Sequence, residues 1–363
     1  MRTGTGKIAL VLALTLCLAA LPASAGPSGA GPGDAPPPPQ EEELNMEEYL
    51  FGHISDAYEW HLFTWKGREV AIPLPCIVFD HGIHVFSSAR LAHGAEYEGL
   101  RIAPEGASHA GKIVRASDGT RPFDISVTKN VLGLIFDSVL LVVLILLCAR
   151  WYRRHDPLKE APSGLAGLLE PVIVTIEQDV IKEAVGPEYR KYSPYLLTAF
   201  FFILINNIMG IVPIFPGGAN ITGNIAVTLV LAMFTFFMVN LFGNKHYWKD
   251  ILWPDVPIFL KAIPIMPVIE IVGMFTKPFS LMIRLFANML AGHIMLLSTI
   301  AVIFLTAKMG PVLNGSMTVV SFLFGIFLDC LELLVAFIQA YVFTMLSSVF
   351  IGLAHQHPEN ETN

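Results

Sequence analysis

A short apolar stretch near residue 284 carries polar side chains that a lipid bilayer would ordinarily exclude. The segment "SLMIRLFANMLAGH" holds Arg284, Asn288 and His293 among leucine, methionine and phenylalanine. A guanidinium stays protonated under any ordinary condition. Its transfer into hydrocarbon costs from about 3 kcal/mol on insertion scales to more than ~10 kcal/mol in simulations. An arginine in such a place indicates chemistry that needs a fixed positive charge.

A second apolar stretch downstream carries groups that could complement the first, namely Glu332 and Gln339. If the two stretches form an antiparallel hairpin of helices, residues at the same level have position numbers that add up to a constant. The pairs Arg284–Gln339 and His293–Glu332 give nearly the same constant. Both place the turn near residue 312, inside "KMGPVLNG". The spacing therefore predicts a hairpin with two levels of facing polar groups.

The helical rotation of about 100° per residue divides these groups between two faces. Asn288 lies about 40° from Arg284 on this count, whereas His293 lies about 180° away, on the opposite face. Straight helices could not make both facing pairs direct, so at least one should act through water or helix curvature. No carboxylate in the chain matches Arg284 in both level and face. We therefore expect its anion to belong to another protein.

Two interpretations of these polar groups compete. Polar side chains inside membranes can simply hold helices together. That alternative has more force for His293 and Glu332 than for Arg284, since an unpaired charge inside a membrane marks a functional site by default.

The composition indicates a membrane protein. The 363 residues are 54% hydrophobic and only 15% charged, whereas soluble domains carry about 25% charged residues. A net charge of −7 gives no support for a nucleic-acid partner. The four cysteines are scattered and form neither a disulfide framework nor a metal-binding spacing. No cofactor and no metal are expected.

The N-terminal region predicts export. Residues 1–25 combine Arg2 and Lys7, an apolar run and the small-residue site "ASA", which is typical of a cleaved signal peptide. The alternative is an uncleaved anchor helix, for which the run is short. Residues 26–45 form a Pro/Gly-rich linker that we expect to be disordered.

Residues 46–128 predict a small, mostly β, periplasmic domain. The segment "HLFTWKGREVAIPLPCIVFD" is typical of a hairpin that turns at "KG". His81 and His84 could bind a metal, but no complete ligand set has zinc spacing. Ordinary polar surface is the favoured interpretation of these two histidines.

Residues 129–355 predict an all-α membrane domain with five helices, and residues 356–363 a cytoplasmic tail. The first span is followed by "RWYRRHDPLK", a basic flank that stays in the cytoplasm. The amphipathic residues 164–186 should lie along the cytoplasmic interface. The last two spans approach or exceed forty residues, whereas ~20 suffice to cross a membrane. They must tilt, bend or lie partly along the membrane. The expected spans are 131–149, 194–212, 223–243, 266–307 and 316–354.

The polar motifs together resemble one known family. The segments "RLFANMLAGH", "PVIE", "INNIMGIVP" and "IQAYVFTMLSSVFI" are similar to subunit a of the bacterial F-type ATP synthase, over residues 131–354. The resemblance implies a long tilted hairpin facing a ring of c subunits, each of which carries an ion-binding carboxylate. It implies the family arginine at Arg284, the asparagine at Asn288, the glutamine at Gln339 and a polar position at Asn207.

What the resemblance implies about function is specific. Two aqueous half-channels would each reach midway across the inner membrane, and Arg284 would meet the ring carboxylate and block leakage between them. His293 and Glu332 would relay protons in the outer half-channel, and Glu270 could line the inner one. The partners would be the c-ring, the b-subunit peripheral stalk, the F1 sector and the lipid membrane. The chain would have no catalytic site of its own.

Two departures from the family pattern stand out. Some bacterial relatives have glutamate where this chain has His293 and histidine where it has Glu332, so the pair is exchanged. Many relatives carry an acid near Gly210, and this chain does not.

The sequence leaves three alternatives to this interpretation open. A sodium-translocating version of the same subunit is compatible with the sequence, because the ion site lies mainly on the ring. A secondary transporter could use Arg284 to bind an anion, although no internal repeat is visible. A purely structural scaffold would not need Arg284 for ion flux.

Overall fold

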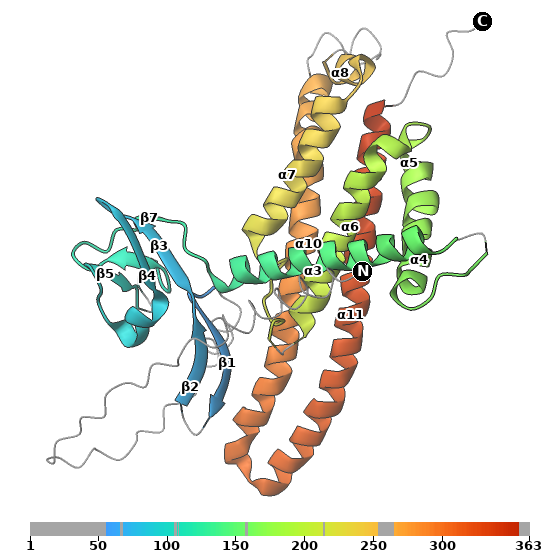
Figure 1. Ribbon diagram of the computed structural model, residues 1–363. Coiled ribbons are helices and arrows are strands. Elements are labelled where there is room, and N and C mark those ends of the chain that lie inside the picture. Colours follow the sequence, from blue (N-terminus) through green and yellow to red (C-terminus); the bar gives the residue numbers. More distant parts are fainter. Residues whose placement is uncertain are drawn as a thin grey trace, which may run out of the picture. The chain divides into compact units, whose positions relative to one another are not determined.

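The computed structural model describes residues 56–65, 68–104, 107, 109–156, 159–212, 215–252 and 265–355. They form two compact units, one over Tyr58–Ser126 and one from Val127 onward that also includes residues 56 and 57. The first unit contains the strands and the second the long helices (Figure 1). The predicted signal peptide, linker and C-terminal tail lie outside the described residues.

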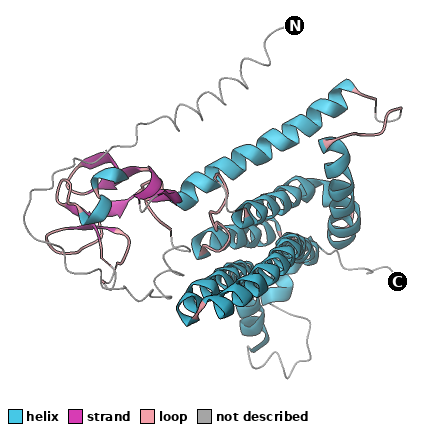
Figure 2. Ribbon diagram, turned by 90° about the horizontal axis from the view of Figure 1, so that it is seen from below, coloured by secondary structure: helices cyan, strands magenta, loops and turns pink. Residues whose placement is uncertain are grey.

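The first unit consists of three small antiparallel sheets (magenta in Figure 2). The strands β3 to β6 contribute alternate apolar side chains to a common core, as the two-residue repeat of a β-strand requires. The core comprises Tyr58, Cys76, Val78, Phe86, Leu91, Leu100 and Ile113. The prediction of a small β-rich region is confirmed, including its first hairpin. The strands are β1 (Glu59–Trp65) with β2 (Arg68–Pro73), β3 (Pro75–Phe79) between β4 (Ile83–Ser87) and β7 (Phe123–Asp124), and β5 (Leu100–Ile102) with β6 (Ile113–Arg115).

The second unit is helical, and five of its described helices are long and apolar enough to cross a membrane. This confirms the five predicted spans. The helices are α3 (Lys129–Arg154), α4 (Leu165–Thr175), α5 (Glu183–Val185), α6 (Tyr189–Ile211), α7 (Ile225–Phe242), α8 (Lys245–Leu252), α10 (Ile265–Thr306) and α11 (Pro311–His355), with a π-helical segment (Ile176–Lys182) joining α4 to α5.

Two elements differ from the sequence-based expectation. The last helix begins at Pro311 rather than near residue 316, because proline suits the first turn of a helix, where its missing N–H is not needed. The polar segment after α7, expected as a loop, forms the short helix α8 over its first eight residues.

The hairpin of α10 and α11 is the largest feature of the helical unit. Its helices contain 42 and 45 residues, so each is more than 60 Å long at about 1.5 Å per residue. The hydrocarbon core is only about 30 Å thick. Figures 1 and 2 show α3 running across the long axes of the hairpin. A membrane that α3 crosses upright would therefore meet the hairpin obliquely.

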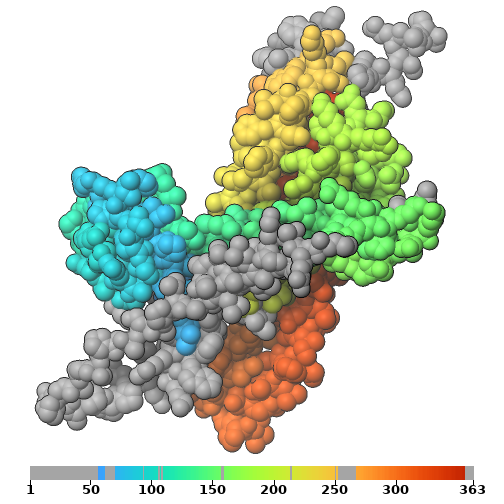
Figure 3. All heavy atoms as spheres, in the orientation of Figure 1, coloured from blue at the N-terminus to red at the C-terminus, as the bar shows by residue number. Residues whose placement is uncertain are grey.

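A shared apolar core joins α6 to the hairpin and to the segment from α4 to α5. Close backbone approach depends on Gly352 of α11, where a Cβ would lie 2.0 Å from the carbonyl oxygen of Ala184. The C-terminal carbonyl groups of α11 are capped by Asn244, whose amides donate to Ala354 and His355. The C-terminal end of the hairpin is thus held, whereas its turn end stands clear of α3 in Figure 3.

Candidate functional site

A direct hydrogen bond joins the two helices of the hairpin at the predicted level. His293 Nδ1 of α10 lies 3.0 Å from Glu332 Oε1 of α11. Glu332 is 7% exposed. Gly292 makes room for it, because a Cβ at that position would lie 3.1 Å from the same carboxylate oxygen. A titratable base and a titratable acid therefore share one buried bond, and such a pair can hold or pass a proton.

Arg284 lies on the opposite side of α10 from this pair. Its side chain and that of Asn288, one turn further on, are exposed in the isolated chain. Among the described residues, Arg284 has neither an ion pair nor a hydrogen bond. Gln339 is buried, and no hydrogen bond joins it to Arg284 within the described part of the chain. Of the two facing pairs, only His293–Glu332 is in direct contact.

Asn207 connects α6 to the hairpin. It is fully buried, its Nδ2 donates to the carbonyl of Ala336 on α11 at 3.2 Å, and its Oδ1 accepts from Thr222 at 2.7 Å. These bonds fix the spacing of α6 and α11 beside Glu332. Gly210, one turn past Asn206 on α6, faces His293, since a Cβ there would lie 3.9 Å from the imidazole Cε1.

Glu270 lies toward the other end of α10, apart from the histidine pair. It is half-buried and close enough to α8 for its charge to act on Tyr247. Burial, and secondarily this charge, raise the pKa of the Tyr247 phenol. That phenol donates to Asn240 Oδ1 at 3.1 Å. Lys277 lies in the same region, with its ammonium 5.7 Å from the centre of the Phe350 ring.

One buried carboxyl group was missed by sequence reasoning. Asp137 of α3 is 2% exposed, and its Oδ1 has no hydrogen-bond partner among the described residues. The available signal was a single acid in the apolar run "GLIFDSVLLVV". Inside a membrane segment, such an acid is itself a functional-site hypothesis.

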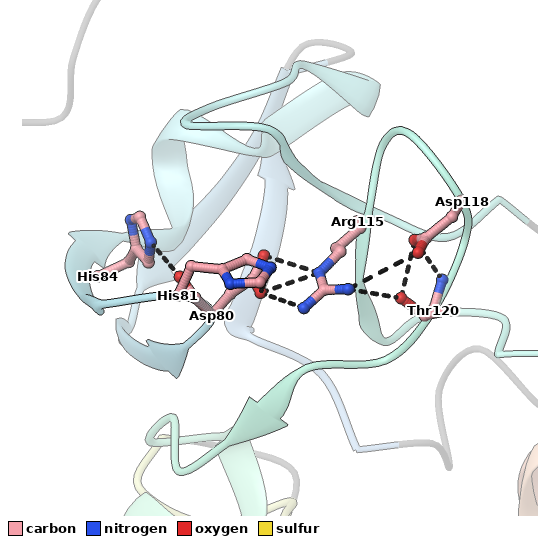
Figure 4. Close-up of polar contacts among 6 residues, drawn as sticks. All are labelled: Asp80, His81, His84, Arg115, Asp118 and Thr120. Carbon is pink, nitrogen blue, oxygen red and sulfur yellow. Dashed lines mark hydrogen bonds and ion pairs between the residues drawn. The ribbon is translucent and has the colours of Figure 1, made fainter.

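The histidines of the strand unit belong to polar surface contacts (Figure 4). His84 contacts the carboxylate of Glu98, and its Nε2 lies 2.9 Å from the carbonyl of Asp80. The hydrogen bond with Glu98 raises the pKa of His84. Arg115 Nε lies 2.9 Å from both carboxylate oxygens of Asp80 and lowers the pKa of that acid. The described residues contain no group of three or more metal-ligating side chains.

Comparison with known proteins gives the family. Residues 135–352 match the model of the family described as ATP synthase A chain. ATP synthase subunit a of Chlorobium phaeobacteroides (strain DSM 266) is 42% identical over 256 residues, covering 69% of this chain and 71% of the relative. ATP synthase subunit a 2 of Prosthecochloris aestuarii is 41% identical over 271 residues, covering 72% and 77%.

The chain belongs to the ATP synthase subunit a family. The resemblance seen in "RLFANMLAGH" is thereby confirmed, and the chain is a multi-pass membrane subunit of the Fo sector, the proton-channel subunit. Residues 49–132 separately match a family described as a domain of unknown function. Within this subunit a, the buried histidine pair and the exposed arginine occupy opposite faces of α10.

We predict that His293 and Glu332 are energetically coupled. The native bond joins an imidazole to a carboxylate. His293→Glu would leave two carboxyl groups that repel each other when ionised, and Glu332→His would leave two imidazoles without an anion. Each single change should impair ATP-driven proton pumping in inverted vesicles. The double exchange should recover much of it, with a coupling of about 1 kcal/mol or more in a double-mutant cycle.

The control for this cycle is Thr299→Val on the same helix, because the Thr299 hydroxyl donates to the Met295 carbonyl of its own helix. It should pump as the unaltered subunit does. A double exchange that pumps no better than the worse single change, at matched amounts of complex, would show that the two residues do not work as a pair.

Proposed function

We propose that this subunit a couples proton movement across the bacterial inner membrane to rotation of the c-ring, and thereby to ATP synthesis. One observation carries the proposal: Arg284 is exposed and has no ion pair or hydrogen bond among the described residues, and it lies on the opposite face of α10 from His293, which contacts the buried Glu332 of α11. The His293–Glu332 pair can pass protons within the subunit. Arg284 faces outward, where a carboxylate of another protein can reach it.

The role of Arg284 follows from its permanent charge. It attracts a ring carboxylate only when that group is ionised, by ~4 kcal/mol at 4 Å and an effective dielectric constant of 20. This favours proton loss as the carboxylate arrives. The same charge repels protons and so separates the two half-channels. The driving force is about 2.3 kcal/mol per charge per 100 mV of membrane potential, plus any pH difference.

The remaining polar groups divide between the two half-channels. His293 and Glu332 belong to the outer one, toward the external turn. Glu270 belongs to the inner one, near the cytoplasmic α8. Asn288 and Gln339 hold water or orient Arg284, and Asn207 supports the outer side through its bonds to Thr222 and Ala336.

In this arrangement the strand-containing domain is periplasmic and the C-terminus is cytoplasmic. The leader with its "ASA" site and the basic "RWYRR" after the first apolar run support that orientation. The b subunits of the peripheral stalk and, through the complex, the F1 sector are the further partners. Sodium in place of protons is the alternative ion.

Replacing Arg284 tests the central step. Arg284→Ala should abolish ATP-driven proton pumping while the complex still assembles. Arg284→Lys should also be badly impaired, because an ammonium is a compact charge that can deprotonate when desolvated. The control is Lys308→Ala, which removes a cation at the turn of the same hairpin. This variant should pump normally. ATP synthesis at the unaltered rate in membranes carrying Arg284→Ala would remove this arginine from the mechanism.

Labelling of introduced cysteines tests the orientation. In a Cys330→Ser background, a membrane-impermeant maleimide added to intact spheroplasts should modify Ala95→Cys of the strand unit. Lys249→Cys of α8 should react only after lysis. Both parent side chains are exposed, so access is decided by the membrane. The reverse labelling pattern would overturn the topology.

A further inference from the structure

We propose that Asp137 of α3 is a proton-carrying residue of the outer access path that leads to His293 and Glu332. The proposal rests on the proposed function, and it starts from the packing of one face of α3. Gly133 and Asp137 of that face are buried, and Leu141 packs against the apolar core that α6 shares with the hairpin. Because these residues are four apart, they lie on one side of the helix. Asp137 therefore points into the helical unit rather than toward lipid.

The segment after α6 brings this face close to the histidine pair. A Cβ on Gly133 would lie 2.9 Å from the Ala219 Cβ, so α3 rests directly on this segment. On its other side, a Cβ on Gly210 would lie 3.5 Å from the Ala219 carbonyl oxygen and 3.9 Å from the His293 imidazole. One residue, Ala219, thus separates the Gly133–Asp137 face of α3 from the place where α6 meets His293.

Unsatisfied polar atoms gather on the elements around this contact. Asp137 Oδ1, Asn206 Oδ1 and Asn220 Nδ2 are all buried and have no hydrogen-bond partner among the described residues. Asn206 is one turn from Gly210, and Asn220 is the neighbour of Ala219. Buried polar groups need partners, and internal water with two to four of them is the usual one. The two acceptor oxygens and the one donor nitrogen lie on α3, on α6 and on the segment after α6. Together they could hydrogen-bond a short chain of water molecules.

The chemistry of Asp137 fits the start of such a chain. A lone carboxylate is costly to bury without a counter-charge, so it needs water or a proton as its partner. Among the described residues, no cation pairs with Asp137. A carboxyl group that takes a proton from water and gives it to a neighbouring water returns to its original state, so the transfer is balanced and consumes nothing. The proton then reaches the His293–Glu332 bond.

The test measures passive proton flux through membrane vesicles stripped of F1, at matched amounts of complex. Asp137→Asn keeps shape and hydrogen bonding but carries no proton, and it should lower the flux by about tenfold to a hundredfold. Asp137→Ala should do the same, and formic acid should restore part of its flux by standing in for the missing carboxyl group. Ser138→Ala is the matched control, because Ser138 bonds to its own helix at Leu134.

Unaltered flux in Asp137→Asn would overturn the proposal. So would a loss in Asp137→Ala that small acids do not restore, because that pattern indicates a structural role. Failure here is distinguishable from failure of the proposed function, since the Arg284 variants test coupling to ATP and these variants test only access from outside.

A separate observation carries a second proposal: we infer that one face of the β4-β3-β7 sheet binds the surface of the lipid bilayer. Strand register places its outward side chains in two rows of three. The opposite side of the sheet supplies Cys76, Val78 and Phe86 to the core. Five of the six outward residues are 39–69% exposed, and all six are apolar. The rows are Val85, Ile77 and Ile125, and Ile83, Phe79 and Phe123.

The short covalent connection between this sheet and the membrane helix α3 indicates that the face binds lipid. Ile125 is followed after three residues by Lys129, the first residue of the membrane helix α3. Four extended steps cover at most about 14 Å, so this end of the face stays within reach of the bilayer surface. Arg121, which is exposed, lies two residues before β7 and can contact lipid phosphate groups. An exposed apolar face of this extent marks a binding surface.

Spin labels on the whole complex in phospholipid vesicles test this inference. In a Cys330→Ser background, a nitroxide at Val85→Cys should be relaxed more by oxygen, which concentrates in lipid, than by a water-soluble nickel chelate. A nitroxide at Ala95→Cys, an exposed position outside the sheet, should show the reverse. Equal exposure of both labels to the chelate would show a free face. Shielding of Val85→Cys from both reagents would show a protein partner. Either result would overturn the inference.

Discussion

The central constraint on this subunit is the cost of placing charged groups in a medium of low dielectric constant. Arg284 cannot lose its proton, and Glu332 is buried, so each needs a partner or water. The helix α10 meets both needs by directing Arg284 and His293 to opposite sides. One side closes on α11 through the His293–Glu332 bond, and the other presents Arg284 outward. The separation keeps the buried acid from neutralising the arginine.

Small residues make this separation possible. Gly292 lets the Glu332 carboxylate approach α10, and a Cβ at Gly210 would be in ordinary van der Waals contact with the His293 ring. Gly133 lets α3 approach the segment after α6, and Gly352 lets α11 approach α5. A Cβ at Gly292 would lie 3.1 Å from the Glu332 carboxylate, and a Cβ at Gly352 would lie 2.0 Å from the Ala184 carbonyl oxygen, so neither position has room for a side chain at the present spacing. The polar contacts of the site therefore depend on how closely the backbones pack.

The long hairpin accounts for the remaining architecture. Helices of 42 and 45 residues cannot cross a bilayer upright. The steep crossing with α3 in Figures 1 and 2 gives them an oblique course. An oblique hairpin presents a long side to a neighbouring protein. This agrees with membership of the ATP synthase subunit a family and explains why so many apolar residues of α11 are exposed in the isolated chain.

Much of the helical unit could be predicted from the sequence because its signals are local. Apolar runs defined the five spans, and the 100° rotation assigned Arg284 and His293 to opposite faces. The matching position sums placed His293 and Glu332 at one level, where the structure joins them. The strand hairpin of β1 and β2 followed from two strand-like runs around the predicted "KG" turn. None of these inferences required knowledge of how distant segments meet.

Tertiary packing decided what periodicity could not. Rotation of each helix about its axis made the His293–Glu332 pair direct and left Arg284 without a contact to Gln339. The partner of Asn207 is Ala336, 129 residues away, and no local pattern encodes that distance. Asp137 looked like one polar residue tolerated in an apolar run. Only the packing of α3 on the segment after α6 showed that its carboxyl group is buried, because burial depends on neighbours that the chain supplies from elsewhere.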